Sequence, residues 1–217
     1  MKRAPSKRER GKRPSRVGVP YKKSETTREL LVKTAIDVIA ERGLASTSVA
    51  DIAEAAGTSK GGVHYYFESK DDLYAKVMVK CCDTLEERII KVFLGGDHGP
   101  LERVQHALAE MWAIRRDGVP ELRVLTELHM LARQDKPMRD ALGEMLRRAR
   151  RQMIETGLGS MMALGIKPKV DQALIPRLII ATLDGLALHN EVDPVAPGDE
   201  PRLLKAIELM VMSLFEL

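Results

Sequence analysis

The stretch that decides the fold is SVADIAEAAGTSKGGVHYYF, residues 48–67. Ser48 and Asp51 have the spacing of a capping box, which predicts the start of a helix. Gly57 interrupts the helical pattern at a position suited to a tight turn, and Ser59 is placed to cap a second short helix. Four small residues allow these two helices to cross closely: Ala50, Ala53, Ala55 and Ala56. The stretch therefore predicts a helix-turn-helix, a motif whose second helix reads the major groove of DNA, with an ordinary helical hairpin of a protein core as the alternative.

A helix is also predicted before this stretch. Thr26 and Glu29 have capping-box spacing, so the helix is expected to open near Thr26. Gly43 is placed to end it in the left-handed conformation. The apolar stripe of this helix consists of Leu31, Ala35, Val38 and Ile39.

Residues 26–73, TTRELLVKTAIDVIAERGLASTSVADIAEAAGTSKGGVHYYFESKDDL, closely resemble the DNA-binding head of the tetracycline-repressor (TetR) family. The resemblance has no gap and includes AxxxIAERG at 35–43, DIAEAAG at 51–57 and YYFxSKxxL at 65–73. Members of this family are dimeric regulators, mostly repressors, that release DNA when a small molecule enters the C-terminal domain. The resemblance thus implies a helix-turn-helix DNA-binding domain at 24–73 and a larger helical effector-binding and dimerisation domain at 74–217.

The resemblance also implies, position by position, which residues contact DNA. Phosphate contacts are expected at Thr47, Ser48 and Lys70, and base or groove-edge contacts at Ser59, Lys60, Gly61 and Gly62. The chemistry agrees with these roles. Lys70 adds a cation at a helix N-terminus, where backbone amides already favour an anion. Gly61 and Gly62 carry no side chain, which lets the second helix approach the bases closely.

An aromatic cluster follows the two glycines, and here the chain departs from the family. His64 stands where the family usually has Tyr in a Tyr-x-His-Phe pattern, and Tyr65 and Tyr66 follow it. The resemblance implies phosphate contacts at this aromatic cluster, which includes Tyr65, and His64 still carries a donor for a phosphate. For Tyr66 and Phe67 the alternative is packing against the first helix.

Composition and charge narrow the classes of protein. The chain has 217 residues, of which 44% are hydrophobic and only 4% aromatic, so its core rests on aliphatic residues and methionine. The formal net charge is +4, yet residues 1–23 hold ten basic side chains against Glu9, which leaves −5 for residues 24–217. This basic arm, rich in Pro, Ser and Gly, is expected to be disordered when free and to suit a polyphosphate partner. Contact with DNA and a merely solubilising role are its two interpretations.

Other classes lack the patterns that they require. Cys81 and Cys82 are adjacent, without the spacing of a zinc site or a redox pair, so reduced packing residues are expected. We find no apolar run long enough for a membrane span and no secretory signal, and we expect a cytoplasmic protein.

Beyond the head the helical period continues, without strand-like alternation of useful length. Ser69 and Asp72 form a third capping-box pattern, which opens the first of these helices. Residues 165–168 are expected to be a turn. The predicted helices cover about 70–93, 101–116, 120–133, 137–163, 170–190 and 201–216. The sequence therefore predicts an all-α protein.

The last two predicted helices carry the expected dimer interface. The helix at 170–190 has two apolar stripes, one with Leu174, Leu178, Ala181, Gly185 and Leu188, the other with Ile175, Ile179, Thr182 and Leu186. Either this helix lies centrally in the core, or one stripe meets a partner subunit, which the resemblance favours. Pro176 is expected to kink the helix or to mark its true first turn. The predicted interface residues are Leu178, Ala181, Gly185, Leu188, Ile207, Met210 and Leu214.

The helices at 101–163 carry side chains suited to a ligand pocket, because Met fills irregular spaces. The predicted lining is His106, Met111, Trp112, His129, Met130, Met145 and Met153, with a plain Met-rich core as the alternative. It indicates an apolar or aromatic small-molecule effector. His106 and His129 lie on different helices without a patterned partner, so no metal and no cofactor are expected.

The expected function is a ligand-responsive, sequence-specific transcriptional regulator, released as a repressor from a palindromic operator by a small molecule. A homodimer is expected because a two-fold protein matches a palindrome. The alternative is a constitutive architectural or global DNA-binding protein without an effector, in which the basic arm dominates binding. An enzyme is not expected, since no nucleophile elbow, phosphate loop or acid–base pair appears.

Overall fold

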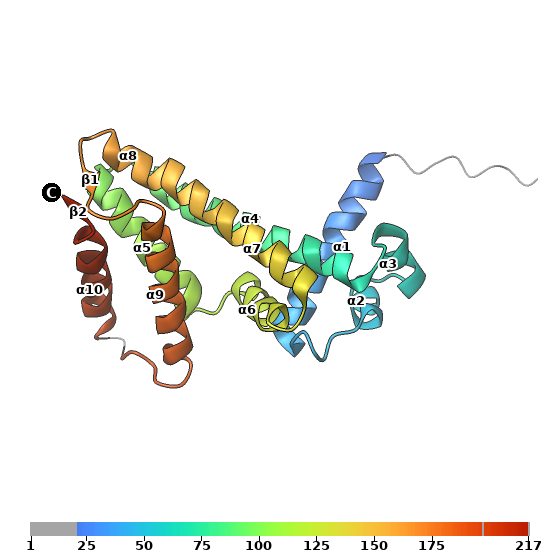
Figure 1. The fold of residues 1–217 in the computed structure, drawn as a ribbon. Coiled ribbons are helices and arrows are strands. Elements are labelled where there is room, and N and C mark those ends of the chain that lie inside the picture. The colour runs from blue at the N-terminus through green and yellow to red at the C-terminus, as the bar shows by residue number, and fades with distance from the viewer. Residues whose placement is uncertain (1–20, 197, 217) are drawn as a thin grey trace, which may run out of the picture.

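The computed structural model describes residues 21–196 and 198–216, and Figure 1 shows their arrangement. The head consists of α1 (Tyr21–Arg42), α2 (Val49–Ala55) and α3 (Lys60–Tyr66). The remaining helices are α4 (Lys70–Leu94), α5 (Pro100–Arg116), α6 (Pro120–Ala132), α7 (Lys136–Met153), the π-helix η1 (Ile154–Leu158), α8 (Gly159–Met162), α9 (Leu174–Asn190) and α10 (Glu200–Met212). Two short strands, β1 (Lys167–Pro168) and β2 (Phe215–Glu216), pair antiparallel. None of the helices in these residues is long and apolar enough to cross a membrane.

The turns of the head follow from its capping residues. Ser48 Oγ accepts a hydrogen bond from the Asp51 amide at 3.2 Å, and Asp51 Oδ2 accepts one from the Ser48 amide at 2.8 Å, which completes the predicted capping box. Gly43 follows the end of α1 with a φ of +80°, and Gly57 follows α2 with a φ of +64°. Residues other than glycine rarely adopt a positive φ. Ser59 caps α3 through the amide of Gly62 at 3.1 Å. The predicted helix-turn-helix is confirmed.

The start of α1 corrects one prediction. The helix begins at Tyr21, so Thr26 and Glu29 lie inside it and do not mark its start. Residues 21–26 contain no Gly or Pro, so nothing stops the helix from extending back past the capping pattern. The predicted arm at residues 1–23 therefore loses its last three residues to α1, and residues 1–20 lie outside the described part of the chain.

Two further boundaries differ from the predicted ones. The single helix expected at 137–163 is α7 followed by η1 and α8, and Gly157 and Gly159 lie at this change of helical pitch. The last helix ends at Met212, after which β2 pairs with β1 at the expected turn. A bridge of two residues is too short to leave an alternating pattern in the sequence. Pro176 lies in the first turn of α9, which was the second of its two interpretations.

Two apolar cores lie at opposite ends of the molecule. The head core joins α1–α4 to α6 and to the first half of α7 through Val124, Leu128 and Leu142. The second core joins α5, α9 and α10 around Trp112, Ile175 and Leu183. Figure 1 shows α4 and α7 running side by side from the head to the far end, and these helices pack against each other. The head is thus built into the rest of the chain through α4 and α6.

Candidate functional site

The recognition helix α3 presents one face to the outside. Ser59, Lys60, Gly61, His64 and Tyr65 are exposed, and the Tyr65 side chain is 79% exposed. Val63 of the same helix and Phe67, which is its C-cap residue, are both buried in the head core. Spaced four residues apart, these two anchors fix the orientation of α3 and direct the intervening residues outward.

The two glycines of α3 have different surroundings. A Cβ atom on Gly62 would lie 2.4 Å from Thr58 Oγ1, so the absence of a side chain relieves contact within the head itself. A Cβ atom on Gly61 would meet nothing closer than Ser59 Oγ at 3.8 Å. A side chain at position 62 would thus require Thr58 to move, whereas nothing within the subunit requires glycine at position 61.

Burial of the Thr47 side chain argues against the phosphate contact predicted for this residue. Its side chain is only 3% exposed, and its hydroxyl donates to the carbonyl of Gly43 at 2.8 Å. Thr47 thus holds the loop before α2 and is excluded from the proposed DNA contacts. Ser48 is exposed, and hydrogen bonds from Ser48, more than the charge of Arg42, lower the pKa of Asp51 below its ordinary value.

Lys70 is exposed at the start of α4, where its ammonium donates to the carbonyl of Thr47 at 3.2 Å. The same nitrogen lies 5.1 Å from the centre of the Tyr74 ring, a cation–π distance. Lys70 therefore positions the loop before α2 while its charge remains at the surface.

The aromatic cluster divides between surface and core. Phe67 is buried in the head core with the guanidinium of Arg28 5.5 Å from its ring centre, which confirms the packing interpretation. Tyr66 is half-buried against the same core, with its ring edge-on to that of Tyr65. The contact with Arg28 joins residues far apart in sequence, so no sequence signal could have shown it.

A cavity of about 270 Å³ lies among α4, α5, α6, α7, η1 and α9. Met111, His129, Met145 and Met153 of the predicted pocket line it. Most of its wall is aliphatic or aromatic, including Ile89, Phe93, Leu125, Leu146, Ile179 and Phe215. The structure therefore brings together four pocket residues from three helices.

The other three predicted pocket residues lie elsewhere. Trp112 is buried in the second core, and its indole N–H donates to Glu200 Oε1 at 2.9 Å. His106 is exposed, with its ring edge-on to that of His98. The Met130 side chain is 57% exposed. None of these three residues lines the cavity.

The cavity wall also carries polar groups that were not predicted from the sequence. Arg115 and Asp184 pair at 2.7 Å, and Arg115 also donates to the carbonyl of Met111 at 3.0 Å. Glu86 of α4 lies in the wall as well. These groups come from three separate helices without a motif, so only the packing of the helices reveals them.

Cys82 also lines the cavity, whereas Cys81 belongs to the head core. Both cysteines are buried and free. Burial raises the pKa of Cys82 to about 12 and also raises that of Cys81, so both thiols stay protonated at neutral pH. This state matches the packing role predicted for them.

An apolar face runs along α9 and α10 on the outside of the second core. Leu178 and Leu188 are 45% and 63% exposed, and Ala181, Gly185 and Met210 are exposed as well. The Thr182 hydroxyl lies 4.0 Å from the Met210 sulfur, which places the two helices next to each other on this face. Leu174 and Leu209 extend the same face, and the sequence analysis did not include them in the interface.

Two predicted interface residues do not lie on this face. Ile207 is 4% exposed and belongs to the core of its own subunit, and Leu214 is half-buried against that core. The buried side of α9, with Ile175 and Ile179, packs into this core too. The proposed dimer surface therefore excludes Ile207 and keeps Leu214 at most at its edge.

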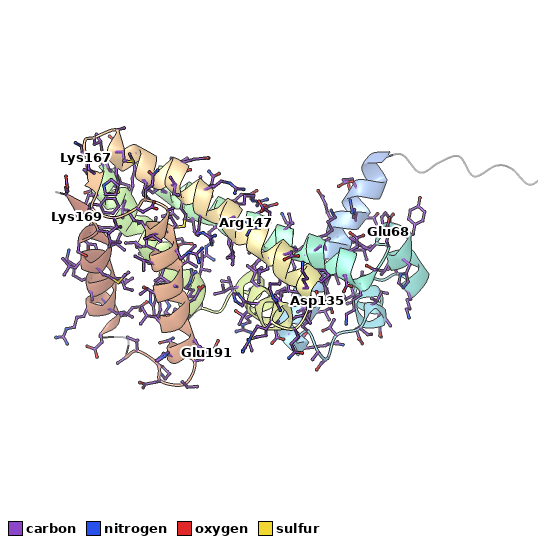
Figure 2. The ribbon with its side chains drawn as sticks, in the orientation of Figure 1. Glu68, Asp135, Arg147, Lys167, Lys169 and Glu191 are labelled. Carbon is purple, nitrogen blue, oxygen red and sulfur yellow. The ribbon has the colours of Figure 1, made fainter. Side chains whose placement is uncertain are left out.

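Figure 2 shows that the head lies far from the end of the molecule that carries α9 and α10. Glu68, directly before α4, lies at the head, whereas Lys167 and Lys169, at and next to β1, lie at the opposite end. Arg147 of α7 lies between these ends. Figure 1 places α3 at the end of the head and α9 and α10 at the opposite end, so the exposed face of α3 and the apolar face lie at different ends of one elongated molecule.

Comparisons with known proteins agree with this architecture. The family of bacterial regulatory proteins, tetR family, matches residues 31–77. The HTH-type transcriptional regulator PksA of Bacillus subtilis (strain 168) is 30% identical over 175 residues, which cover 79% of this chain and 82% of PksA. The probable acrEF/envCD operon repressor of Escherichia coli (strain K12) is 31% identical over 83 residues, 38% of this chain and 37% of that repressor.

Solved structures show the same fold. A putative TetR-family transcriptional regulator from Rhodococcus sp. superposes with a TM-score of 0.73 at 23% identity, covering 86% of this chain and 99% of that one. The fatty acid degradation regulator FadR from Bacillus halodurans gives 0.67 at 20% identity, covering 86% and 94%. With the helix-turn-helix, the all-helical body and the relationship to PksA over most of both chains, this protein belongs to the TetR family of DNA-binding transcriptional regulators.

Proposed function

We propose that the protein is a homodimeric, sequence-specific repressor that leaves a palindromic operator when a small apolar or aromatic molecule enters the cavity. The observation that carries this proposal is that the cavity and the head share side chains. Leu142 is buried in the head core and also lines the cavity, and Leu125 packs against that core from the cavity wall. A ligand that displaces these two leucines acts on the packing of the head.

Two helices provide the mechanical connection. α4 begins with Lys70 at the DNA-facing end and carries cavity residues from Cys82 to Phe93 in its second half. α6 lines the cavity with Leu122, Leu125, Thr126 and His129, while Val124 and Leu128 of the same helix lie in the head core. Release requires only that the ligand prefers one arrangement of these helices, a coupling typically worth ~1–3 kcal/mol.

The proposed DNA contacts come from the exposed face of the head. Ser59, Lys60 and Gly61 are placed to meet base edges at the start of the recognition helix, with Gly62 supporting the close approach. Ser48 and Lys70 supply phosphate contacts on either side, and His64 and Tyr65 add donors from the outer face of α3. One head reads only a few base pairs, so the proposal requires two heads joined through the apolar face of α9 and α10.

Selection of bound sequences from a random DNA pool tests the DNA-binding part. The proposal expects a palindromic consensus, and Lys60→Ala is expected to change the preferred bases at particular positions. Enrichment of bent or A·T-rich DNA without a consensus would instead support the constitutive architectural alternative. A uniform loss of affinity of Lys60→Ala for every sequence would remove Lys60 from base readout.

The effector-binding part has its own test, in which part of the cavity is filled. Gly157 lines the cavity, and a Cβ atom there would meet nothing within 4 Å. Gly157→Leu is expected to leave operator binding intact and to reduce release by any effector found in a compound screen. Gly159→Leu is the matched control, since Gly159 is exposed and does not line the cavity. Equal release of both variants would argue against the cavity as the effector site.

A further inference from the structure

The exposed side of α9 has the spacing of a coiled-coil seam. Apolar residues recur there at alternating intervals of four and three, which keeps them on one side of a helix. They are Leu174, Leu178, Ala181, Gly185, Leu188 and Val192. All six are exposed, and Val192, just past the end of the helix, is 85% exposed. These six residues, the α9 seam, therefore lie open on the described part of the subunit.

The α9 seam is self-complementary when two copies run antiparallel. Its two small residues stand at the centre, and two large residues follow on each side. In an antiparallel pair, Ala181 of one helix lies opposite Gly185 of the other, and Leu178 lies opposite Leu188. Leu174 then lies opposite Val192. The central small residues let the two helices approach closely, while the larger residues fill the space on either side.

Charges beside the seam distinguish an antiparallel pair from a parallel one. Arg177, Asp184 and Glu191 recur every seven residues along one flank of the seam. In an antiparallel pair this flank meets its own copy, so Arg177 lies near Glu191 of the other helix, twice per dimer. In a parallel pair it meets the opposite flank, which carries no acid, only Ile175, Thr182 and His189. The charge pattern therefore favours the antiparallel direction.

Asp184 lies near the two-fold axis of such a pair, opposite its own copy. Like charges that face each other would weaken the dimer. Arg115 of α5 removes this difficulty, because its guanidinium lies 2.7 Å from Asp184 Oδ1 and its side chain is only 9% exposed. The acid at the centre of the flank is thus neutralised within its own subunit.

The beginning of α9 carries positive charge without a partner. Arg177 and Arg150 form no ion pair with a described residue, and Glu144 of α7 pairs instead with Arg147 and Arg151. Burial, and next to it the charge of Arg177, lower the pKa of Arg150 below its ordinary value. An acid from another chain would therefore be stabilised beside these arginines.

The end of α9 carries the opposite charge. Glu191 and Asp193 are exposed, and neither forms an ion pair with a described residue, whereas Asp199 of the same loop pairs with Arg202. Glu191 cannot reach Arg177 of its own subunit, because the helical rise between them amounts to about 21 Å. The two ends of α9 can therefore neutralise each other only between two chains.

We infer that two copies of this chain join through an antiparallel pair of α9 helices, in which Arg177 of each protomer pairs with Glu191 of the partner subunit. This inference deepens the proposed function, because it gives the homodimer a direction and a register. α10 leaves the charged flank open, since it packs beside the other flank, where Thr182 meets Met210. Its exposed Leu209 and Met210 continue the apolar surface there.

Charge reversal tests the register. Arg177→Glu and Glu191→Arg each turn two attractive pairs into repulsive ones, and each is expected to raise the dimer Kd at least ~10-fold at low ionic strength. The double variant Arg177→Glu/Glu191→Arg restores both pairs with their charges exchanged, so its Kd is expected to return to within ~3-fold of the wild-type value. Sedimentation equilibrium of the full-length proteins, with fluorescence detection to reach low concentrations, measures these constants.

Arg123→Glu and Glu127→Arg are the matched controls, because both residues are exposed on α6 and lie outside the α9 seam. They should leave the dimer Kd unchanged. Single variants as tight as the wild type, or a double variant no tighter than the single ones, would overturn the antiparallel register and leave the homodimer in place. A wild-type protein that stays monomeric would overturn both this inference and the homodimer of the proposed function. Recovery in the double variant also excludes misfolding as the cause of the single effects.

Discussion

Gly61 and Gly62 are neighbours in the recognition helix, but their substitution is expected to have different effects. Glycine in a helix costs about 1 kcal/mol relative to alanine, and a Cβ on Gly61 meets no close neighbour within the subunit. Gly61→Ala is therefore expected to raise the free energy of unfolding by up to ~1 kcal/mol. It is also expected to weaken operator binding, because the added methyl group lies on the exposed face of α3 that is proposed to meet the bases. Chemical denaturation and fluorescence anisotropy with labelled operator measure the two effects.

Gly62→Ala provides the comparison. Its Cβ would lie 2.4 Å from the Thr58 hydroxyl, which would have to rotate away, so a smaller gain in stability is expected. If Gly61→Ala were more stable and bound DNA as tightly as the wild type, close approach to DNA would no longer explain this glycine.

Asp51 connects the capping of α2 to pH. Hydrogen bonds from Ser48 keep the pKa of Asp51 below its ordinary value, and Arg42 adds a smaller effect at 3.7 Å. Because the folded pKa is the lower one, the stabilisation is present above the unfolded value and is lost as the pH falls through the folded pKa. Ser48→Ala is expected to cost about 1 kcal/mol of folding free energy and to raise the pKa of Asp51. An NMR titration of the Asp51 carboxyl carbon checks this. An unchanged pKa would show that the Ser48 hydroxyl does not cause the shift, and would leave the backbone amide of residue 48 and Arg42 as its causes.

Single residues also show the limit of prediction from sequence. Ser48, Ser59 and Gly57 were predicted correctly, because capping and turn formation depend on neighbours within four residues. Thr47 was placed at DNA by position alone, yet burial and its bond to the Gly43 carbonyl remove it. The pair of Arg115 and Asp184 in the cavity wall was not predicted, because α5 and α9 meet only in the folded chain.

Among whole elements, α9 is the helix whose exposed side most needs a partner. Its buried stripe fills the second core, while Leu178, Ala181, Gly185 and Leu188 remain exposed on the other side. Leu178→Lys is expected to shift the protein from dimer to monomer and to weaken operator binding strongly, since a charge in an apolar interface is costly. Analytical ultracentrifugation measures the first effect and anisotropy the second. Leu94→Lys is the control, because Leu94 is also exposed but lies at the end of α4 and not on the apolar face of α9 and α10. If the Leu178→Lys protein remained a dimer, the dimer interface would have to lie on another surface.

Element types were easier to predict than element boundaries. The helical period identified each long helix, since a period of 3.6 repeats over many residues. The start of α1 was wrong because a capping pattern inside a helix does not stop it. The two-residue pairing of β1 with β2 depends on the burial of Phe215 against the second core, a contact between distant parts of the chain.

At the scale of the whole molecule, charge is divided between two segments. Residues 1–20 hold eight basic side chains and one acid, Glu9, directly before α1, while the chain from residue 24 onwards is net acidic. Most of this negative charge lies in the head, since residues 24–73 hold five basic and nine acidic side chains. The basic arm is therefore the main source of net attraction to the DNA backbone. Two arms in a dimer double this contribution, so the salt dependence of binding reports on it directly.

Deletion of residues 1–20 is expected to weaken binding to every DNA sequence and to flatten the dependence of log Kd on log salt concentration. Each phosphate that is no longer neutralised removes about 0.9 from the slope, because one fewer counterion is released. The palindromic preference should survive, since Ser59, Lys60 and Gly61 remain in place. Anisotropy titrations of both proteins at several salt concentrations, on operator and on scrambled DNA, separate the two effects. An unchanged slope would show that the arm does not touch phosphate, and its basic residues would then serve solubility alone.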